Sequence, residues 1–230
     1  MPSKKSNTGR AVVPAKNTNL AHLPERITIG DREVRPEQLY TINDRRPSAR
    51  GPWTDEPFDK IAWQDAETGL DCILLRQPSG AWGGFVAVVP EHPLYGYRED
   101  AIPAATRFTP HGGIDYAKPC ARRLPEAIQI CHARVRPSPF TTSAPTRADH
   151  EREEAWWPGF TANKAGDLVP SVAKPPLARE EGETYRDVGY MYGETIKLAR
   201  QLKAIEEPGG VSSGSELPLV PPRLRKPQGR

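Results

Sequence analysis

Short apolar runs in the first half of the chain predict β-strands. The segments 61–63, 72–76 and 85–89 are rich in β-branched and aromatic side chains and are bounded by turn-forming residues. Pro90 ends the last of them. The stretch 78–84 contains three glycines, so we expect the chain to reverse there and the two flanking strands to pair antiparallel.

The pattern is less regular in the second half of the chain. Residues 124–135 could form a strand or a short helix, and we favour a strand because apolar and polar side chains alternate over 127–131. Residues 112–116 are expected to be extended. Residues 137–149 are rich in Pro, Ser and Thr, which is typical of an exposed insertion.

One clear helix is predicted near the C-terminus, over 185–206. Pro208 and the two glycines after it end the pattern, and Thr184 could cap the start with Asp187 three residues on. Its apolar face repeats with helical spacing and consists of Val188, Tyr192, Thr195, Ala199 and Leu202, with Met191, Leu198 and Ile205 beside them.

These elements predict an α+β fold: a small, mostly antiparallel sheet with long Pro-rich loops, packed by the C-terminal helix. Four parts are expected along the chain. Residues 1–26 form a disordered basic tail and 27–51 an extended lead-in, in which 27–29 and 39–42 have strand character. Residues 52–207 form a single α+β domain, and 208–230 form a disordered Pro-rich basic tail.

Charge is unevenly distributed. Five basic residues and one acidic residue fall in 1–26, and four basic residues and one acidic residue fall in 208–230. The total is +3, so the region between the tails carries a net charge of −4. The core therefore has no positive field to recruit nucleic acid, although the tails could make weak non-specific contacts.

Cysteine usage and hydropathy indicate a soluble protein of a reducing compartment. The cysteines are odd in number and contain no Cys-x-x-Cys pair. The basic start, Met1-Pro-Ser-Lys-Lys, is not followed by the apolar stretch of a signal peptide. No run approaches the roughly 18 apolar residues that a membrane helix needs, so we expect no membrane partner.

Four side chains in the predicted loops are candidates for chemistry: His92, His111, Asp115 and Asp167. His92 follows the strand 85–89, and functional side chains are common where a sheet fixes the start of a loop. Its imidazole could act as a general base or a metal ligand. Alternatively, it could be a loop histidine that bonds a main-chain carbonyl and sets the turn.

His111 is followed by Gly112 and Gly113, which allow positive φ and a close approach of N–H groups to a ligand. If the segment is extended, His111 and Asp115 point to the same face. With Asp167 they could pair an imidazole with an orienting carboxylate, or hold a divalent metal, the one cofactor the sequence suggests. The alternative is a simple turn with loop-capping aspartates.

The thiols and tryptophans have two interpretations each. Cys72 could be a nucleophile, but its apolar neighbours favour a buried thiol. Cys131 and His132 cannot pair with each other if they lie on a strand, because adjacent side chains point to opposite faces. Trp156 and Trp157 could stack on a ligand ring, but paired tryptophans more often anchor a small core.

Several motifs recur together in a known group of proteins. They are Gly84-Phe-Val-x-Val-x-Pro90 with His92-Pro-Leu-Tyr-Gly96, His111-Gly-Gly-Ile-x-Tyr116, Ile130-Cys-His132, and Trp156-Trp-x-Gly-Phe160 with Gly166-Asp167. In this order, over roughly residues 51–206, the chain resembles a family of small phage- and prophage-encoded proteins of uncharacterised activity. In that family the last motif continues with Asp, Cys, Ala and His, where this chain has Thr161-Ala-Asn-Lys164.

The resemblance implies a phage-associated accessory protein in the cytoplasm of the host cell. Its four candidate side chains would form a pocket for a small ligand or a metal. The alternative is a non-enzymatic interaction protein that binds or blocks a host protein, and the departure at 161–164 favours this alternative because it would remove a carboxylate, a thiol and an imidazole.

Overall fold

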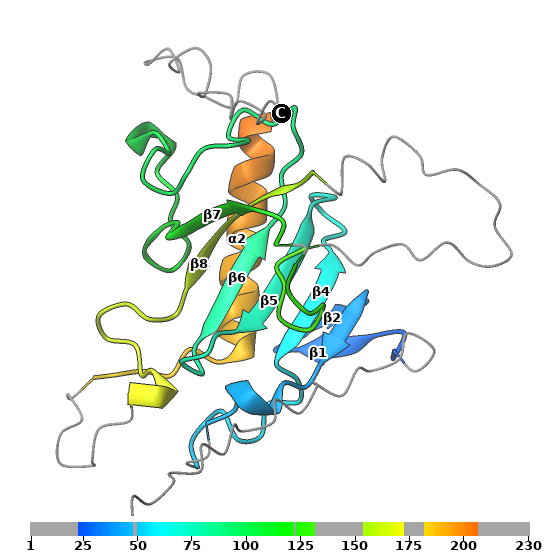
Figure 1. Cartoon of the computed structure of the whole chain (residues 1–230), viewed down its shortest axis with the longest axis vertical. Coiled ribbons are helices and arrows are strands. Elements are labelled where there is room, and N and C mark those ends of the chain that lie inside the picture. The colour runs from blue at the N-terminus through cyan, green and yellow to red at the C-terminus, as the bar shows by residue number, and fades with distance from the viewer. Residues whose placement is uncertain (1–22, 48–49, 122, 132–153, 173–181, 207–230) are drawn as a thin grey trace, which may run out of the picture.

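The computed structural model describes residues 23–47, 50–121, 123–131, 154–172 and 182–206 (Figure 1). Within these residues a six-stranded antiparallel sheet, a two-stranded hairpin and one long helix confirm the predicted α+β fold. The elements are β1 (Ile27–Ile29), β2 (Arg32–Val34), β3 (Gln38–Tyr40), β4 (Lys60–Gln64), β5 (Asp71–Arg76), β6 (Trp82–Val86), β7 (Tyr116–Pro119), β8 (Trp156–Thr161) and α2 (Val188–Glu206).

The strands of the main sheet lie in the order β3-β4-β5-β6-β8-β7. β3 belongs to the segment 27–51, so part of the expected lead-in is the edge strand of this sheet. β1 and β2 form the separate hairpin around the turn at Gly30. The predicted insertion 137–149, nearly all of the first tail and the whole second tail lie outside the described residues.

The predicted hairpin is confirmed: β5 and β6 pair antiparallel, with Leu74 opposite Gly84. The reversal is tighter than expected, because Gln77 N–H donates to the Ala81 carbonyl oxygen over 2.7 Å and Gly80 takes a φ of +80°. β6 therefore spans Trp82–Val86, so the strand predicted over 85–89 begins and ends three residues earlier than expected. The remaining glycines of the expected turn lie within the strand.

Close packing explains a glycine inside this strand. A Cβ atom at Gly84 would lie 2.3 Å from Oγ1 of Thr195 on α2. The absence of a side chain lets the helix approach the sheet directly above β6. Gly84 therefore determines the distance between the two layers.

The sheet has a core on each face. α2 runs along one face, where it packs against a cluster that includes Trp63, Cys72, Leu74 and Val86 (Figure 1). The opposite cluster is formed by Ile73, Leu75, Phe85 and Trp157 with Ala127 and Ile130 from the segment 120–131. The tryptophan pair lies on β8 and is buried, which confirms its predicted place in the core.

Three local predictions are wrong. Within 124–131 the chain forms turns rather than a strand, because Pro125 accepts hydrogen bonds from the N–H groups of residues 128 and 129. The extended segment predicted at 112–116 begins only at Tyr116. The helix begins at Val188, and Asp187, not Thr184, caps it through a 2.8 Å bond from Tyr190 N–H to Oδ1.

Cys120 and Cys131 form a disulfide, with Cα atoms 5.0 Å apart, while Cys72 is a free buried thiol. Disulfides persist mainly in oxidising compartments, so this bond argues against the reducing compartment that cysteine usage suggested. The cytoplasmic location stays a prediction. Among the helices of the described residues, none has the length and apolar character needed to cross a bilayer.

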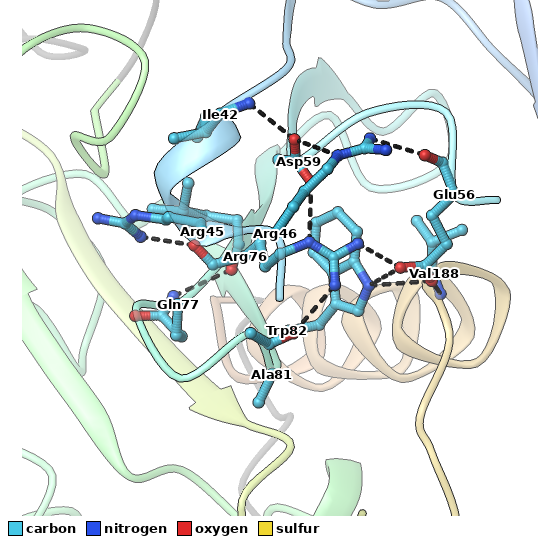
Figure 2. Close-up of polar contacts among 12 residues, drawn as sticks. Ile42, Arg45, Arg46, Glu56, Asp59, Arg76, Gln77, Ala81, Trp82 and Val188 are labelled. Carbon is cyan, nitrogen blue, oxygen red and sulfur yellow. Dashed lines mark hydrogen bonds and ion pairs between the residues drawn. The ribbon is translucent and has the colours of Figure 1, made fainter. Parts of the chain in front are cut away.

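A buried cluster of charged side chains joins the sheet to the start of α2 (Figure 2). Arg76 on β5 is fully buried; its Nε donates to Asp59 Oδ1 over 2.8 Å and its Nη2 donates to Glu56. Its Nη1 donates to the Gly80 carbonyl oxygen over 2.9 Å, and the guanidinium lies 4.5 Å from the Trp82 ring centre. Each nitrogen has a partner, the condition under which a buried charge is tolerated.

Two carboxylates extend this cluster to the surrounding chain. Glu56 accepts hydrogen bonds from Val188 N–H over 2.9 Å and from the Tyr185 hydroxyl over 2.7 Å. Because Val188 is the first residue of α2, a negative charge stabilises the positive end of the helix dipole. Asp59 accepts from Ile42 N–H over 2.7 Å, which ties the segment after β3 to the same cluster.

The substitution Leu202→Asp should destabilise the fold by about 3–5 kcal/mol, because it places an unpaired charge on the fully buried face of α2. Ala204→Asp, on the exposed face of the same turn, is the matched control and should cost less than about 1 kcal/mol. Urea unfolding of both variants measures the difference. Similar losses at the two positions would show that the helix face is assigned incorrectly.

The substitution Arg76→Met should cost about 3–5 kcal/mol, because it leaves the buried Glu56 carboxylate without a cation and leaves Asp59 with Arg46 alone. Arg200→Met breaks an ion pair with Glu67 in which both side chains are more than half exposed, and should leave the free energy of unfolding nearly unchanged. Chemical denaturation of the two variants tests the contrast. A small loss for Arg76→Met would mean that the buried cluster does not stabilise the fold.

Candidate functional site

His111 lies in a short segment with an unusual backbone. Its φ and ψ are 34° and 53°, in the left-handed region, and Gly112 and Gly113 that follow also have positive φ. Histidine tolerates this region better than most residues, but the conformation is still costly for a side chain with a Cβ atom. The two glycines permit the turn that the sequence suggested, and the turn directs His111 toward α2.

The imidazole of His111 is held on both sides. Its Nε2 lies 2.6 Å from Asp167 Oδ2, and its Nδ1 lies 3.0 Å from the Tyr190 hydroxyl oxygen. The main-chain N–H of His111 donates to Glu194 Oε2 over 2.7 Å. Tyr190 and Glu194 are one turn apart on α2, so the helix positions both contacts.

Hydrogen-bond roles follow from the chemistry of the partners. Asp167 accepts from Arg186 Nε over 2.8 Å and from Lys164 N–H over 2.9 Å, so both of its oxygens act as acceptors. Because Asp167 acts as the acceptor, we assign the proton on His111 to Nε2. Nδ1 then accepts the proton of the Tyr190 hydroxyl. The three side chains form a continuous chain from Asp167 through His111 to Tyr190.

Asp115 lies beside this chain and is joined to it through Lys164. The Lys164 ammonium is 2.5 Å from Asp115 Oδ2, and its main-chain N–H contacts Asp167. The same Asp115 oxygen accepts from the Thr161 hydroxyl over 2.8 Å, whereas Asp115 Oδ1 is buried without a partner among the described residues. Among the described residues, no hydrogen bond or ion pair joins Asp115 to His111.

His92 lies elsewhere and has a structural role. Its Nδ1 accepts from Leu94 N–H over 3.0 Å, and its Nε2 is 3.0 Å from the Leu202 carbonyl oxygen. Leu202 is twelve residues beyond Tyr190 on α2, which corresponds to about 18 Å along the helix. The structure therefore brings His111 and Asp167 together, places Asp115 next to them, and separates His92 as a loop histidine that bonds a carbonyl.

The geometry offers no metal site among these side chains. Within the described parts of the chain, no group of three or more His, Cys, Asp or Glu residues is arranged to hold a metal ion. Both ring nitrogens of His111 already have protein partners. The carboxylate of Asp167 is shared between His111 and Arg186, so this centre is suited to proton transfer rather than to coordination.

Tyr190 is the member of the chain that the sequence analysis missed. Its side chain is the exposed end, with 37% of the residue accessible, whereas His111 and Asp167 are buried. Burial of its hydroxyl and the carboxylate of Glu194 raise the pKa of Tyr190, so it stays protonated at neutral pH. The spacing of Arg186, Tyr190 and Glu194, each four residues apart, was the available signal.

Lys60 is a second group that the sequence did not suggest. It lies on β4, is fully buried, and donates from Nζ to the Glu126 carbonyl oxygen over 2.6 Å. Burial lowers the pKa of Lys60 to about 7, with a smaller opposing effect from Glu126. By contrast, burial raises the pKa of the Cys72 thiol well above its ordinary value, so this thiol is unsuited to nucleophilic chemistry.

No family model, curated protein or solved structure matches the chain. The resemblance to phage- and prophage-encoded proteins therefore stays a prediction, and the site is interpreted from its own geometry.

The substitution Lys60→Met should remove a pH dependence of stability between about pH 7 and about pH 10.4. The pKa of Lys60 is about 7 in the folded protein, so in this window the unfolded chain binds one more proton than the folded chain. The free energy of unfolding of the unmodified protein should rise there by up to about 1.4 kcal/mol per pH unit relative to the variant. The destabilisation caused by burying the Lys60 amine is complete below pH 7. It disappears above the pKa that Lys60 has in the unfolded chain.

Urea unfolding of the two proteins at several pH values across this window provides the measurement. Subtracting the free energy of unfolding of the variant from that of the unmodified protein cancels the contribution of tyrosine titration, which both proteins share. A difference that stays constant with pH would show that Lys60 does not titrate in this range in the folded protein.

Proposed function

We propose that this protein binds a small polar ligand at the Tyr190 hydroxyl and exchanges a proton with it through His111 and Asp167. The observation that carries the proposal is the unbroken chain of hydrogen bonds from the buried Asp167 carboxylate to Tyr190, a residue that is 37% exposed. A positioned acid–base group of this kind contributes about 10²–10⁴-fold to a reaction.

Each member has a distinct role in this proposal. Asp167 holds the imidazole in one tautomer and stabilises the imidazolium that forms when His111 takes a proton. His111 Nδ1 removes the proton from Tyr190 as that hydroxyl acts on the ligand, and later returns it. Arg186 lies 4.7 Å from the centre of the Tyr190 ring and also bonds Asp167, so it fixes both ends of the chain.

The backbone of His111 supports a functional role. Left-handed conformations of residues other than glycine are concentrated at active sites and ligand-binding segments, where the surrounding structure enforces them. Here the enforcing contact is the bond from His111 N–H to the buried Glu194 carboxylate. A metal ion has no part in this proposal, because both ring nitrogens are already bonded to protein groups.

A specific observation also favours a non-enzymatic interaction protein, for example one that binds a host protein. Thr161 and Lys164 both bond Asp115 beside the histidine. They belong to the segment in which this chain departs from the phage-encoded proteins that it resembles. Their contacts neutralise Asp115 and reduce the number of groups free to act on a ligand.

Hydrolysis of p-nitrophenyl acetate is a direct test, because this activated ester reports general base and nucleophilic assistance by the Tyr190 hydroxyl. Tyr190→Phe removes the hydroxyl and should lower the rate at least about tenfold. Tyr192→Phe is the matched control, because Tyr192 lies on the same helix and its ring packs against Trp63. The hydrolysis rate of this variant should match that of the unmodified protein.

Thermal unfolding followed by circular dichroism verifies that both variants fold. Equal rates for the two variants would contradict the relay, as would a rate for the unmodified protein no higher than that of buffer. Either result would leave the interaction protein as the supported function.

A further inference from the structure

The surroundings of Lys60 form a second polar site on the sheet face opposite α2. The Lys60 ammonium lies 5.5 Å from the centre of the Tyr40 ring and donates to the main chain of Glu126. Gln38, on the neighbouring strand, donates from Nε2 to Glu126 Oε1 over 2.9 Å. Its other side-chain atom, Oε1, is buried without a partner among the described residues. A buried orphan acceptor next to a buried amine marks a site that is incompletely satisfied by the protein.

One segment covers this site. The contacts that Lys60 and Gln38 make above the sheet both go to Glu126, which lies within the segment 120–131. Its described residues, 120–121 and 123–131, form no strand or helix, and the disulfide between Cys120 and Cys131 joins its two ends. The disulfide fixes these two ends relative to each other and so restricts the conformations of the segment that carries Glu126.

We propose that Lys60 is a modification site for acyl donors, and that opening the Cys120–Cys131 disulfide exposes it. A dithiol reductant would convert the two sulfurs to thiols and itself be oxidised to a disulfide. The segment 120–131 would then separate locally from the sheet and uncover the amine. This site is independent of the His111 centre, which lies on the other side of the sheet with α2.

The reaction is nucleophilic acyl transfer. The lone pair of Lys60 Nζ attacks the acyl carbon, a C–N bond forms, and the bond to the leaving group breaks with its electron pair. The nitrogen then loses a proton to water. Burial lowers the pKa of Lys60 to about 7 in the closed protein. Once the segment opens, water solvates the amine and its pKa rises toward the ordinary lysine value, so the reaction proceeds through the neutral fraction, as at any accessible lysine.

Amine labelling with sulfosuccinimidyl acetate, read by peptide mass spectrometry, tests the proposal on the full chain. The double variant Cys120→Ser/Cys131→Ser lacks the disulfide, and the unmodified protein is labelled before and after treatment with dithiothreitol that is then removed. Lys60 should be acetylated at least about tenfold faster in the variant and in the reduced protein than in the oxidised protein. Lys197, whose side chain is 54% exposed on α2, is the internal reference and should not change.

Cys72 distinguishes local opening from unfolding. It is fully buried on the α2 side of the sheet and should remain unreactive toward iodoacetamide throughout. Slow acetylation of Lys60 in every sample, or equally rapid acetylation in the oxidised protein, would overturn the proposal. Alkylation of Cys72 in parallel with acetylation of Lys60 would also overturn it, because exposure would then require global unfolding.

Discussion

The fold depends on the buried guanidinium of Arg76. Two carboxylates share this one cation: Asp59 precedes β4 and holds the segment after β3, and Glu56 holds the first N–H of α2. Taking these charges out of water costs several kcal/mol for each ion, and only the complete set of partners compensates for it. The cluster therefore fixes where the edge of the sheet and the start of the helix meet, and a partial version of it would not be stable.

The position of α2 decides the chemistry of the candidate site. With its first turn fixed at Glu56 and its close approach to β6 set by Gly84, the helix presents Tyr190 and Glu194 to the loop that carries His111. The two polar centres differ in one respect. Arg76 is enclosed and fully bonded, which is typical of a structural cluster, whereas the hydrogen-bonded chain from Asp167 ends at Tyr190, an exposed residue.

The two faces of the sheet carry different polar sites. On the α2 face a loop histidine is held in a strained backbone by contacts to the helix. On the other face an irregular segment, closed by a disulfide, covers Lys60. The sheet between them is the rigid element, and each site is built from a loop that the sheet or the helix holds in place.

The sequence by itself determined the local elements with strong patterns. Alternation, β-branched residues and helical spacing predicted β4, β5 and α2, the end of β6 at 85–86, and also the antiparallel hairpin, because these features depend on neighbouring residues. It also singled out His111 and Asp167, since a histidine before two glycines and an aspartate after a glycine are visible as motifs. The start of β6 was misplaced, because glycines that permit a turn also permit close packing, and only the contact with Thr195 distinguishes the two.

Tertiary structure alone decided which distant side chains meet. Nothing local to Arg76 shows that it lies beneath residues 56 and 59, and nothing local to Lys60 shows that residue 126 covers it. His92 and His111 had similar settings in the sequence, yet one bonds a helix carbonyl and the other an aspartate 56 residues away. Burial and long-range pairing set these partners, and the energy of a buried polar group depends on all its partners at once rather than on its neighbours in the chain.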